Sequence, residues 1–205
     1  MTTLLQINAS IQGENGQSSQ LANRFVAAWR RQHPASRVLR RDLAADPVPH
    51  LTAERFGAFL TAPEQRNDSQ RAIAQYSDAL IEELRKADVI VLGLPMYNFG
   101  VPSQLKAYFD HIARAGHTFN YTAQGPVGLL EGKQVYVFAA RGGLYAGAPL
   151  DTQTPYVRDF LGFLGMQDIE FVFAEGLAID AQRRDSALDA ARATIDGLLE
   201  KRAAA

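Results

Sequence analysis

Residues 88–100 read D-V-I-V-L-G-L-P-M-Y-N-F-G, and this stretch decides the fold. Its first part, residues 89–92, is an apolar run without any alternating polar residue. Such a run predicts a strand buried on both faces, as in a parallel sheet. Gly93 and Pro95 are expected to interrupt the strand, and residues 96–99 follow in a tight loop.

This loop consists of Met96, Tyr97, Asn98 and Phe99, and Ser103 is expected to cap the helix that follows. In open α/β sheets, ligands bind beyond the carboxyl ends of the strands, where this loop lies. Its apolar side chains suit the face of a flat aromatic ligand, and its backbone amides suit a polar ring edge. A loop filled with aromatic residues for packing alone is the alternative interpretation.

The chain has 205 residues, of which 47% are hydrophobic and 21% charged, so we expect one globular domain over residues 1–205. It has no cysteine, which excludes disulfides, thiol catalysis and cysteine-ligated metals. The four histidines are scattered, and their spacing predicts no metal site. A net charge of −1 predicts no attraction to nucleic acid or anionic lipid. We find no run long enough for a membrane span and no signal peptide, so we expect a cytoplasmic protein.

A second polar loop follows a short predicted strand at residues 4–7. It contains Ser10 and then Gly16, Gln17 and Ser18 immediately before a helix. A helix N-terminus offers unpaired N–H groups and a positive dipole, so an anion is favoured there. Neither the phosphate-loop signature nor the dinucleotide fingerprint is present. A serine-capped helix after a turn is the alternative interpretation.

Five predicted strands alternate with helices, at residues 4–7, 37–41, 89–92, 135–139 and 169–173. This alternation predicts a doubly wound, five-stranded parallel sheet with helices on both faces. Because the dinucleotide fingerprint is absent, the flavodoxin-like order 2-1-3-4-5 is favoured. In that order the loops after the first and third strands form the two walls of one crevice.

The fourth predicted strand runs directly into Ala140, Arg141, Gly142 and Gly143. Paired glycines after a strand allow the backbone to approach a ligand closely. The three loops together describe a phosphate seat beside a slot for a flat ring. That is the shape of a flavin mononucleotide (FMN) site.

Two other segments are rich in turn-forming residues. Residues 44–68 predict an excursion with short helical pieces that covers a site or a partner subunit. Residues 118–132 predict a small hairpin or flap around two aromatic residues. The alanine tail at residues 203–205 is expected to be disordered.

Seven short stretches match one known family in order. They are P-M-Y-N-F at 95–99, S-Q-L-K at 103–106, A-R-A-G at 113–116, R-G-G at 141–143, T-P-Y at 154–156, F-L-G-F at 160–163 and F-V-F-A-E-G at 171–176. The chain resembles, essentially end to end, the FMN-dependent NADH:azoreductase and quinone reductase family. The resemblance implies a flavodoxin-like homodimer with one FMN per subunit, in a site completed by the neighbouring chain.

The resemblance also implies roles for the loops. Ser10 and residues 16–18 would hold the FMN phosphate, residues 96–99 would line the isoalloxazine, and residues 140–143 would approach its polar edge. Tyr121 and Phe163 resemble substrate-facing aromatic residues at the dimer interface. The implied activity is reduction of quinones and azo compounds by NADH or NADPH, with ping-pong kinetics through the flavin. No side chain is expected to be a catalytic acid, base or nucleophile.

Four positions depart from the family pattern. Relatives often carry serine where this chain has Gly16 and Ala140. This chain therefore lacks two hydroxyls, and backbone N–H groups would replace them. Some relatives carry arginine near Leu60 and histidine at Tyr145. We expect Arg141, together with the glycine N–H groups, to stabilise negative charge on the reduced ring.

Three rival interpretations remain at this stage. A flavodoxin-type electron carrier usually presents a strongly acidic face, which the net charge of −1 disfavours. A phosphoacceptor receiver domain needs clustered acids after the first strand, where this chain has Asn8 and Ser10. A quinone reductase with incidental azo activity fits the sequence equally well.

Overall fold

The computed structural model describes residues 1–203, with the side chains of residues 1–200. Of the alanine tail at residues 203–205, residue 203 is helical, so its expected disorder is wrong, and residues 204–205 lie outside the described residues. In chain order the elements are β1 (Thr3–Asn8), η1 (Gly13–Asn15), α1 (Gln17–Gln32), β2 (Arg37–Asp42), α2 (Ala53–Leu60), η2 (Pro63–Gln65), α3 (Asp68–Lys86), β3 (Val89–Pro95), α4 (Ser103–Ile112), β4 (Phe119–Thr122), β5 (Gly125–Gly128), β6 (Gln134–Ala140), α5 (Gln153–Phe163), β7 (Asp168–Ala174) and α6 (Ala181–Ala203).

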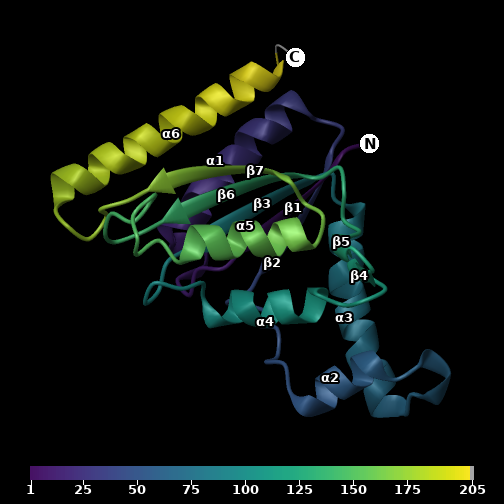
Figure 1. Ribbon diagram of the computed structural model, residues 1–205. Coiled ribbons are helices and arrows are strands. Elements are labelled where there is room, and N and C mark those ends of the chain that lie inside the picture. The colour runs from purple at the N-terminus through teal and green to yellow at the C-terminus, as the bar shows by residue number, and fades with distance from the viewer. Residues whose placement is uncertain (204–205) are drawn as a thin grey trace.

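Five strands form one parallel sheet in the order β2-β1-β3-β6-β7. Counted without the two hairpin strands, this is the order 2-1-3-4-5. The predicted hairpin within residues 118–132 is confirmed as the antiparallel pair β4–β5. The carboxyl ends of β1, β3 and β6 lie side by side, because these strands are neighbours in the sheet (Figure 1).

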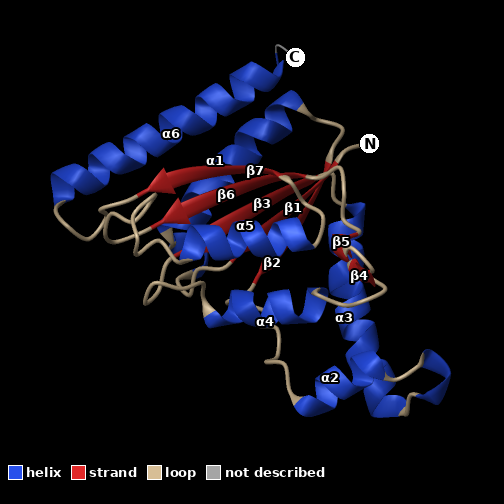
Figure 2. Ribbon diagram, viewed as in Figure 1, coloured by secondary structure: helices blue, strands red, loops and turns tan. Residues whose placement is uncertain are grey.

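Strand β3 is buried on both faces, as its apolar run predicts. Val89 and Val91 belong to the core beneath α1 and α6. Ile90, Leu92 and Leu94 belong to the core beneath α3, α4 and α5. Figure 2 shows the red sheet between these two layers of blue helices. The alternation follows from the strand period of two, which sends successive side chains to opposite faces.

The strand does not end where the glycine and proline predict. It pairs with β6 as far as Pro95, so Gly93 lies inside the strand. A Cβ at Gly93 would be 3.2 Å from the carbonyl oxygen of Ser18, so glycine here lets the start of α1 pack closely against β3. The expected cap of α4 is also wrong. Pro102 is the N-cap and Ser103 the first helical residue.

The excursion between β2 and α3 projects away from the sheet and contains α2, which packs on α3 (Figure 1). Arg66 stabilises this excursion, since its Nε donates to the carbonyl oxygens of Ala58 and Thr61. Leu60 and Phe56 remain exposed on its surface, by 71% and 52%. Within the described residues, no helix has both the length and the apolar character needed to cross a membrane.

Candidate active site

Three loops meet at the carboxyl edge of the sheet. The Ser10 hydroxyl after β1 lies 3.4 Å from the Tyr97 hydroxyl after β3. The backbone N–H of Met96 donates to the carbonyl oxygen of Ala140 at the end of β6, over 3.1 Å. The predicted crevice walls are therefore in contact, as the strand order requires.

The start of α1 is an open anion seat. Gly16 is the N-cap in an extended conformation, and no side chain caps the helix, so the serine-capped alternative is wrong. Among the described residues, the N–H groups of Gln17, Ser18 and Ser19 have no acceptor. The hydroxyls of Ser18 and Ser19 are buried and unpartnered. Buried unpaired donors are costly, so these groups are arranged for a ligand that accepts hydrogen bonds.

Gly16 also lets the two halves of this seat approach each other. A Cβ at this position would lie 2.6 Å from the Cβ of Ser10. Only glycine fits between the loop after β1 and the first turn of α1 without moving the backbone. A serine at this position would therefore displace Ser10.

The loop after β3 is a strained turn. Asn98 and Phe99 have φ values of 49° and 65°, in the left-handed region that non-glycine residues rarely adopt. Tyr97 and Gly100 exchange two backbone hydrogen bonds, of 3.2 and 3.0 Å, which close the turn. Two positive φ values in succession are typical of a type I′ turn. Strain of this kind is common at ligand sites, where the surrounding structure holds it in place.

The glycine loop after β6 presents backbone donors. The carbonyl oxygens of Gly142 and Gly143 accept from the N–H groups of Ala178 and Gly176. Their own N–H groups have no acceptor among the described residues. Tyr145 lies over Gly143, and a Cβ added at Gly143 would be 2.7 Å from the Tyr145 ring. Its ring centroid is 5.7 Å from that of Phe99. The loops after β3 and β6 thus share an aromatic contact that sequence reasoning missed.

Arg141 does not face the site as expected. Its side chain is fully buried, with its Nη1 3.1 Å from Glu175 and 3.2 Å from Asp151. Its Nη2 donates to the Thr154 hydroxyl. The guanidinium also lies over the Phe173 ring, 4.9 Å from its centroid. The expectation that its charge stabilises a reduced ring is therefore corrected: Arg141 anchors the glycine loop from below.

Asp151 and Glu175 complete this anchor. Burial raises the pKa of Asp151, but hydrogen bonds from Thr154 and Arg141 outweigh it, so its pKa lies below the ordinary value. Glu175 also accepts from the backbone N–H groups of Tyr145 and Ala146. The ends of β6 and β7 and the start of α5 are joined through these two carboxylates. Asp151 had no local sequence signal, and Glu175 had only its place in the F-V-F-A-E-G stretch at the end of a strand.

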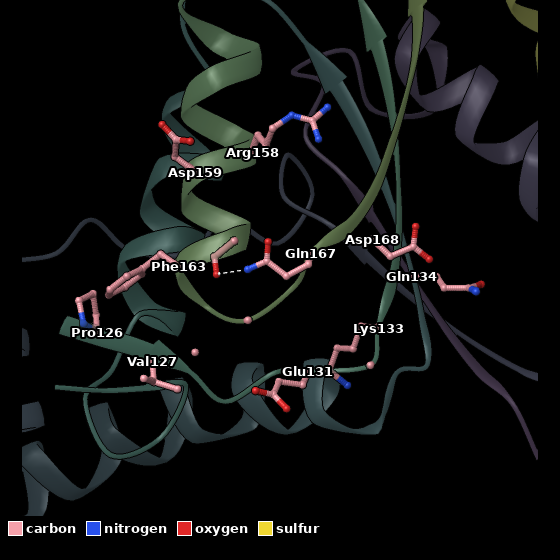
Figure 3. Close-up of a pocket in the computed structure, with 14 residues that line it drawn as sticks. Pro126, Val127, Glu131, Lys133, Gln134, Arg158, Asp159, Phe163, Gln167 and Asp168 are labelled. Carbon is pink, nitrogen blue, oxygen red and sulfur yellow. Dashed lines mark hydrogen bonds between the residues drawn. The ribbon is translucent and has the colours of Figure 1, made fainter. Parts of the chain in front are cut away.

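Tyr121 and Phe163 lie at the opposite edge of the sheet from these loops. Tyr121 is on β4, and Phe163 ends α5 just before the turn into β7. Phe163 lines a hollow of about 1080 Å³ beside the hairpin strand β5 (Figure 3). Within one chain, both aromatic residues are therefore remote from Ser10 and the 96–99 loop. Their expected role requires a second chain.

Among the described residues, no group of three or more His, Cys, Asp or Glu side chains is placed to hold a metal ion. His111 is buried in α4 with its ring against Phe59 and Tyr76. Burial lowers the pKa of His111, so the ring is neutral near pH 7. This is a structural histidine under α2.

Comparison with known proteins assigns the family. A model of the flavodoxin-like fold matches residues 2–199. An FMN-dependent NADH:quinone oxidoreductase of Cellvibrio japonicus is 56% identical over 196 residues, which cover 96% of this chain and 98% of that protein. The crystal structure of an azoreductase from Bacillus anthracis str. Sterne has a TM-score of 0.90 at 28% identity, and the match covers 98% of this chain and 100% of that one.

A second solved structure contains a ligand. It is an FMN-dependent NADH-azoreductase from Bacillus anthracis str. Ames Ancestor in complex with FMN. Its TM-score is 0.89 at 25% identity, and the match covers 98% of this chain and 99% of that one. The family model and the high identity to a curated relative agree with the three converging loops. The chain therefore belongs to the flavodoxin-like family of FMN-dependent NADH:quinone oxidoreductases and azoreductases.

Proposed function

We propose that this protein is an FMN-dependent oxidoreductase that uses NADH to reduce quinones. The observation that carries the proposal is the set of unpartnered donors at the start of α1, next to the strained aromatic loop after β3. An anion seat beside an aromatic slot fits the two ends of FMN. The names of the relatives, an NADH:quinone oxidoreductase and an azoreductase, support the same assignment.

The phosphate end of FMN fits the start of α1. The N–H groups of Gln17 and Ser18 and the buried hydroxyl of Ser18 would donate to phosphate oxygens, and the helix dipole favours their charge. The Ser10 hydroxyl lies at the junction with Tyr97 and would add a donor. Backbone N–H groups at the start of α1 and in the glycine loop would replace the two serine hydroxyls that the family resemblance implies at Gly16 and Ala140.

The ring end of FMN fits between the loops after β3 and β6. Met96, Tyr97 and Phe99 would cover the ring face, and Asn98 would contact its polar edge. The N–H groups of Gly142 and Gly143, which have no acceptor among the described residues, would donate to that edge as well. Donors at this edge favour negative charge on the ring. When bound, FMN supplies two-electron chemistry, and the chain supplies position and electrostatics.

Azo compounds are a second proposed class of electron acceptor, and NADPH a second donor. A single open ring face would be used first by the nicotinamide and then by the acceptor. This order predicts ping-pong kinetics, with no side chain acting as acid, base or nucleophile. The physical requirement is a flat, apolar surface beside the ring, which exposed Phe99 and half-buried Tyr97 provide.

We further propose that the active protein is a homodimer whose sites are completed by the partner. Tyr121 is 76% exposed at the edge remote from the loops of its own chain. Phe56 and Leu60 of α2 are also exposed, in a segment that projects from the sheet. Exposed apolar side chains on projecting segments are typical of an interface. Sedimentation should find a dimer, and an active, FMN-loaded monomer would contradict this.

The activity is tested by visible spectroscopy under nitrogen. We expect the FMN-loaded protein to lose its flavin absorbance on addition of NADH and to recover it on addition of a quinone. Bound FMN that neither NADH nor NADPH bleaches would indicate an electron carrier instead. Absence of FMN binding would remove the proposed site.

The phosphate seat is tested by a matched pair of serine variants. Ser18→Ala removes a hydroxyl that has no protein partner, so the apoprotein should keep its Tm while the FMN Kd rises about tenfold or more. Ser77→Ala removes a buried hydroxyl that donates to the His111 carbonyl, so its apoprotein Tm should fall while the FMN Kd is unchanged. The opposite pattern would place the anion elsewhere.

A further inference from the structure

The strained loop after β3 is held at both ends by one side chain from another element. Gln153, at the start of α5, is 1% exposed. Its Nε2 donates to the carbonyl oxygens of Pro95 and Gly100, each over 2.9 Å. These two residues flank the loop 96–99. The neighbouring Thr152 hydroxyl donates to the carbonyl oxygen of Phe99, over 2.5 Å.

The orientation of the Gln153 amide follows from its partners. Both partners are carbonyl oxygens, which only accept, so the NH₂ end must face them. The Oε1 atom is then left buried without a partner. An unsatisfied buried acceptor destabilises the fold, whereas an apolar side chain here would not have this cost. Local costs of this kind are expected at functional sites.

The two bonds determine the shape of the loop. Asn98 and Phe99 hold positive φ values only if the residues on either side are fixed. The bonds from Gln153 fix the residue before the loop and the residue after it, and Thr152 fixes the carbonyl of Phe99. The loop is therefore tied to the first turn of α5 at three points.

The same turn of α5 also anchors the glycine loop. Thr154 accepts from Arg141, and its backbone N–H donates to Asp151, which pairs with Arg141. The residues from Asp151 to Thr154 thus contact both loops that are proposed to hold the flavin ring. Their relative position is set from one short segment that lies outside both loops.

We propose that Gln153 is a positioning residue, which holds the 96–99 loop in the shape that accepts the FMN ring by donating to Pro95 and Gly100. The proposal rests on the proposed function, since the ring is the ligand concerned. Gln153 acts through the loop backbone. Its effect is therefore on the affinity for FMN and on the environment of the bound ring.

The test compares FMN binding by wild type, Gln153→Leu and Gln153→Glu, with Gln167→Glu as the matched control. Gln167 follows the other end of α5, and its Nε2 also donates to a backbone carbonyl, that of Gly162. FMN affinity is measured by quenching of flavin fluorescence on titration with apoprotein. Far-UV circular dichroism confirms that each variant is folded.

Gln153→Leu removes both donated bonds and should raise the FMN Kd at least tenfold. Gln153→Glu places a carboxyl group against two carbonyl oxygens. Its protonated form donates one bond, and its ionised form donates none and is repelled. The ratio of its Kd to that of wild type should therefore rise at least tenfold as pH increases from 5 to 8. Using the ratio cancels the titration of the FMN phosphate, whose second pKa is about 6.

Gln167→Glu should match wild type at every pH. Thr152→Val removes only the exposed bond to Phe99 and should raise the Kd by a smaller factor, which keeps the test open if Gln153→Leu does not fold. Wild-type affinity in the Gln153 variants would overturn the proposal. Equal weakening of Gln153→Glu at all pH values would also overturn it, because side-chain shape would then matter and not the donated bonds. Failure of wild type to bind FMN would instead refute the proposed function.

Discussion

Replacement of Arg141 by leucine should destabilise the apoprotein strongly. The Arg141 side chain is 0% exposed, and its partners Asp151 and Glu175 are 6% and 14% exposed. The substitution leaves both carboxylates without their cation in a site with little water. Removal of one member of a buried ion pair costs about 3–5 kcal/mol. For a domain of this size each kcal/mol lowers the Tm by about 2–4 °C, so a decrease of about 6–20 °C is expected.

The matched control is Arg158→Leu. Arg158 and Arg141 each lie over a phenylalanine of β7, with guanidinium-to-centroid distances of 5.1 Å to Phe171 and 4.9 Å to Phe173. Arg158 is exposed and forms no ion pair among the described residues. Its loss therefore removes only an exposed cation–π contact of about 0.5–1 kcal/mol.

Both variants are compared with wild type by thermal unfolding of the FMN-free protein at pH 7, followed by circular dichroism. The stacking contribution is common to the two substitutions, so the difference between their Tm values reports the buried ion pairs together with the bond to the Thr154 hydroxyl. Equal Tm values for the two variants would refute the reasoning, because they would show that the carboxylates are solvated without Arg141. The glycine loop would then have another anchor.

Three further predictions follow from the same geometry. Gly16→Ala should weaken FMN binding about tenfold in a titration and cost about 1–3 kcal/mol of stability, because the alanine Cβ would crowd Ser10. The control Gly197→Ala lies in α6 with open space around it and should be neutral or stabilising. Asn98→Ala should also weaken FMN binding. Asn98→Gly should preserve the turn, since only glycine and asparagine readily adopt the φ of 49° at this position. Equal losses of FMN affinity in the two variants would show that the amide matters and not the backbone. The pKa of Asp151 is lower in the folded protein than its ordinary value of 3.8, so its ionised form stabilises the fold above pH 3.8, and this stability is lost as pH falls through the folded pKa. Asp151→Asn should therefore flatten the acid limb of a curve of stability against pH. An unchanged acid limb would contradict this.

The strand pattern was readable because it depends on local physics. An apolar run without alternation can be satisfied only where both faces are buried, which predicted β3 and the parallel sheet. Leu21, Phe25 and Trp29 recur at helical spacing and are buried in α1 as a single stripe. The end of β3 was misjudged, because Gly93 and Pro95 were treated as breakers. Within this sheet, Gly93 instead makes room for the start of α1.

The candidate site was predictable in its loops and less so in its side chains. The positions of the loops after β1, β3 and β6 follow from strand order, which predicted one crevice between the first two, and the contact between Ser10 and Tyr97 lies there. The burial of Arg141 was not, because its partners Asp151 and Glu175 are 10 and 34 residues away in the sequence, just before α5 and just after β7. A charged residue beside two glycines looks like a ligand contact until its partners are known.

The amino-acid sequence by itself determined the alternation of strands and helices, the order of the sheet and the three loops at its carboxyl edge. The alternation and the loops depend on hydrophobic period and on glycine and proline placement, which act over a few residues. The strand order was favoured because the dinucleotide fingerprint is absent. Only the tertiary structure decided which side chains face the site and which support it. Gln153 and Arg141 are alike in being polar residues near loop ends, but both are buried against partners far away in the chain. Long-range burial selects those partners, and no local pattern encodes it.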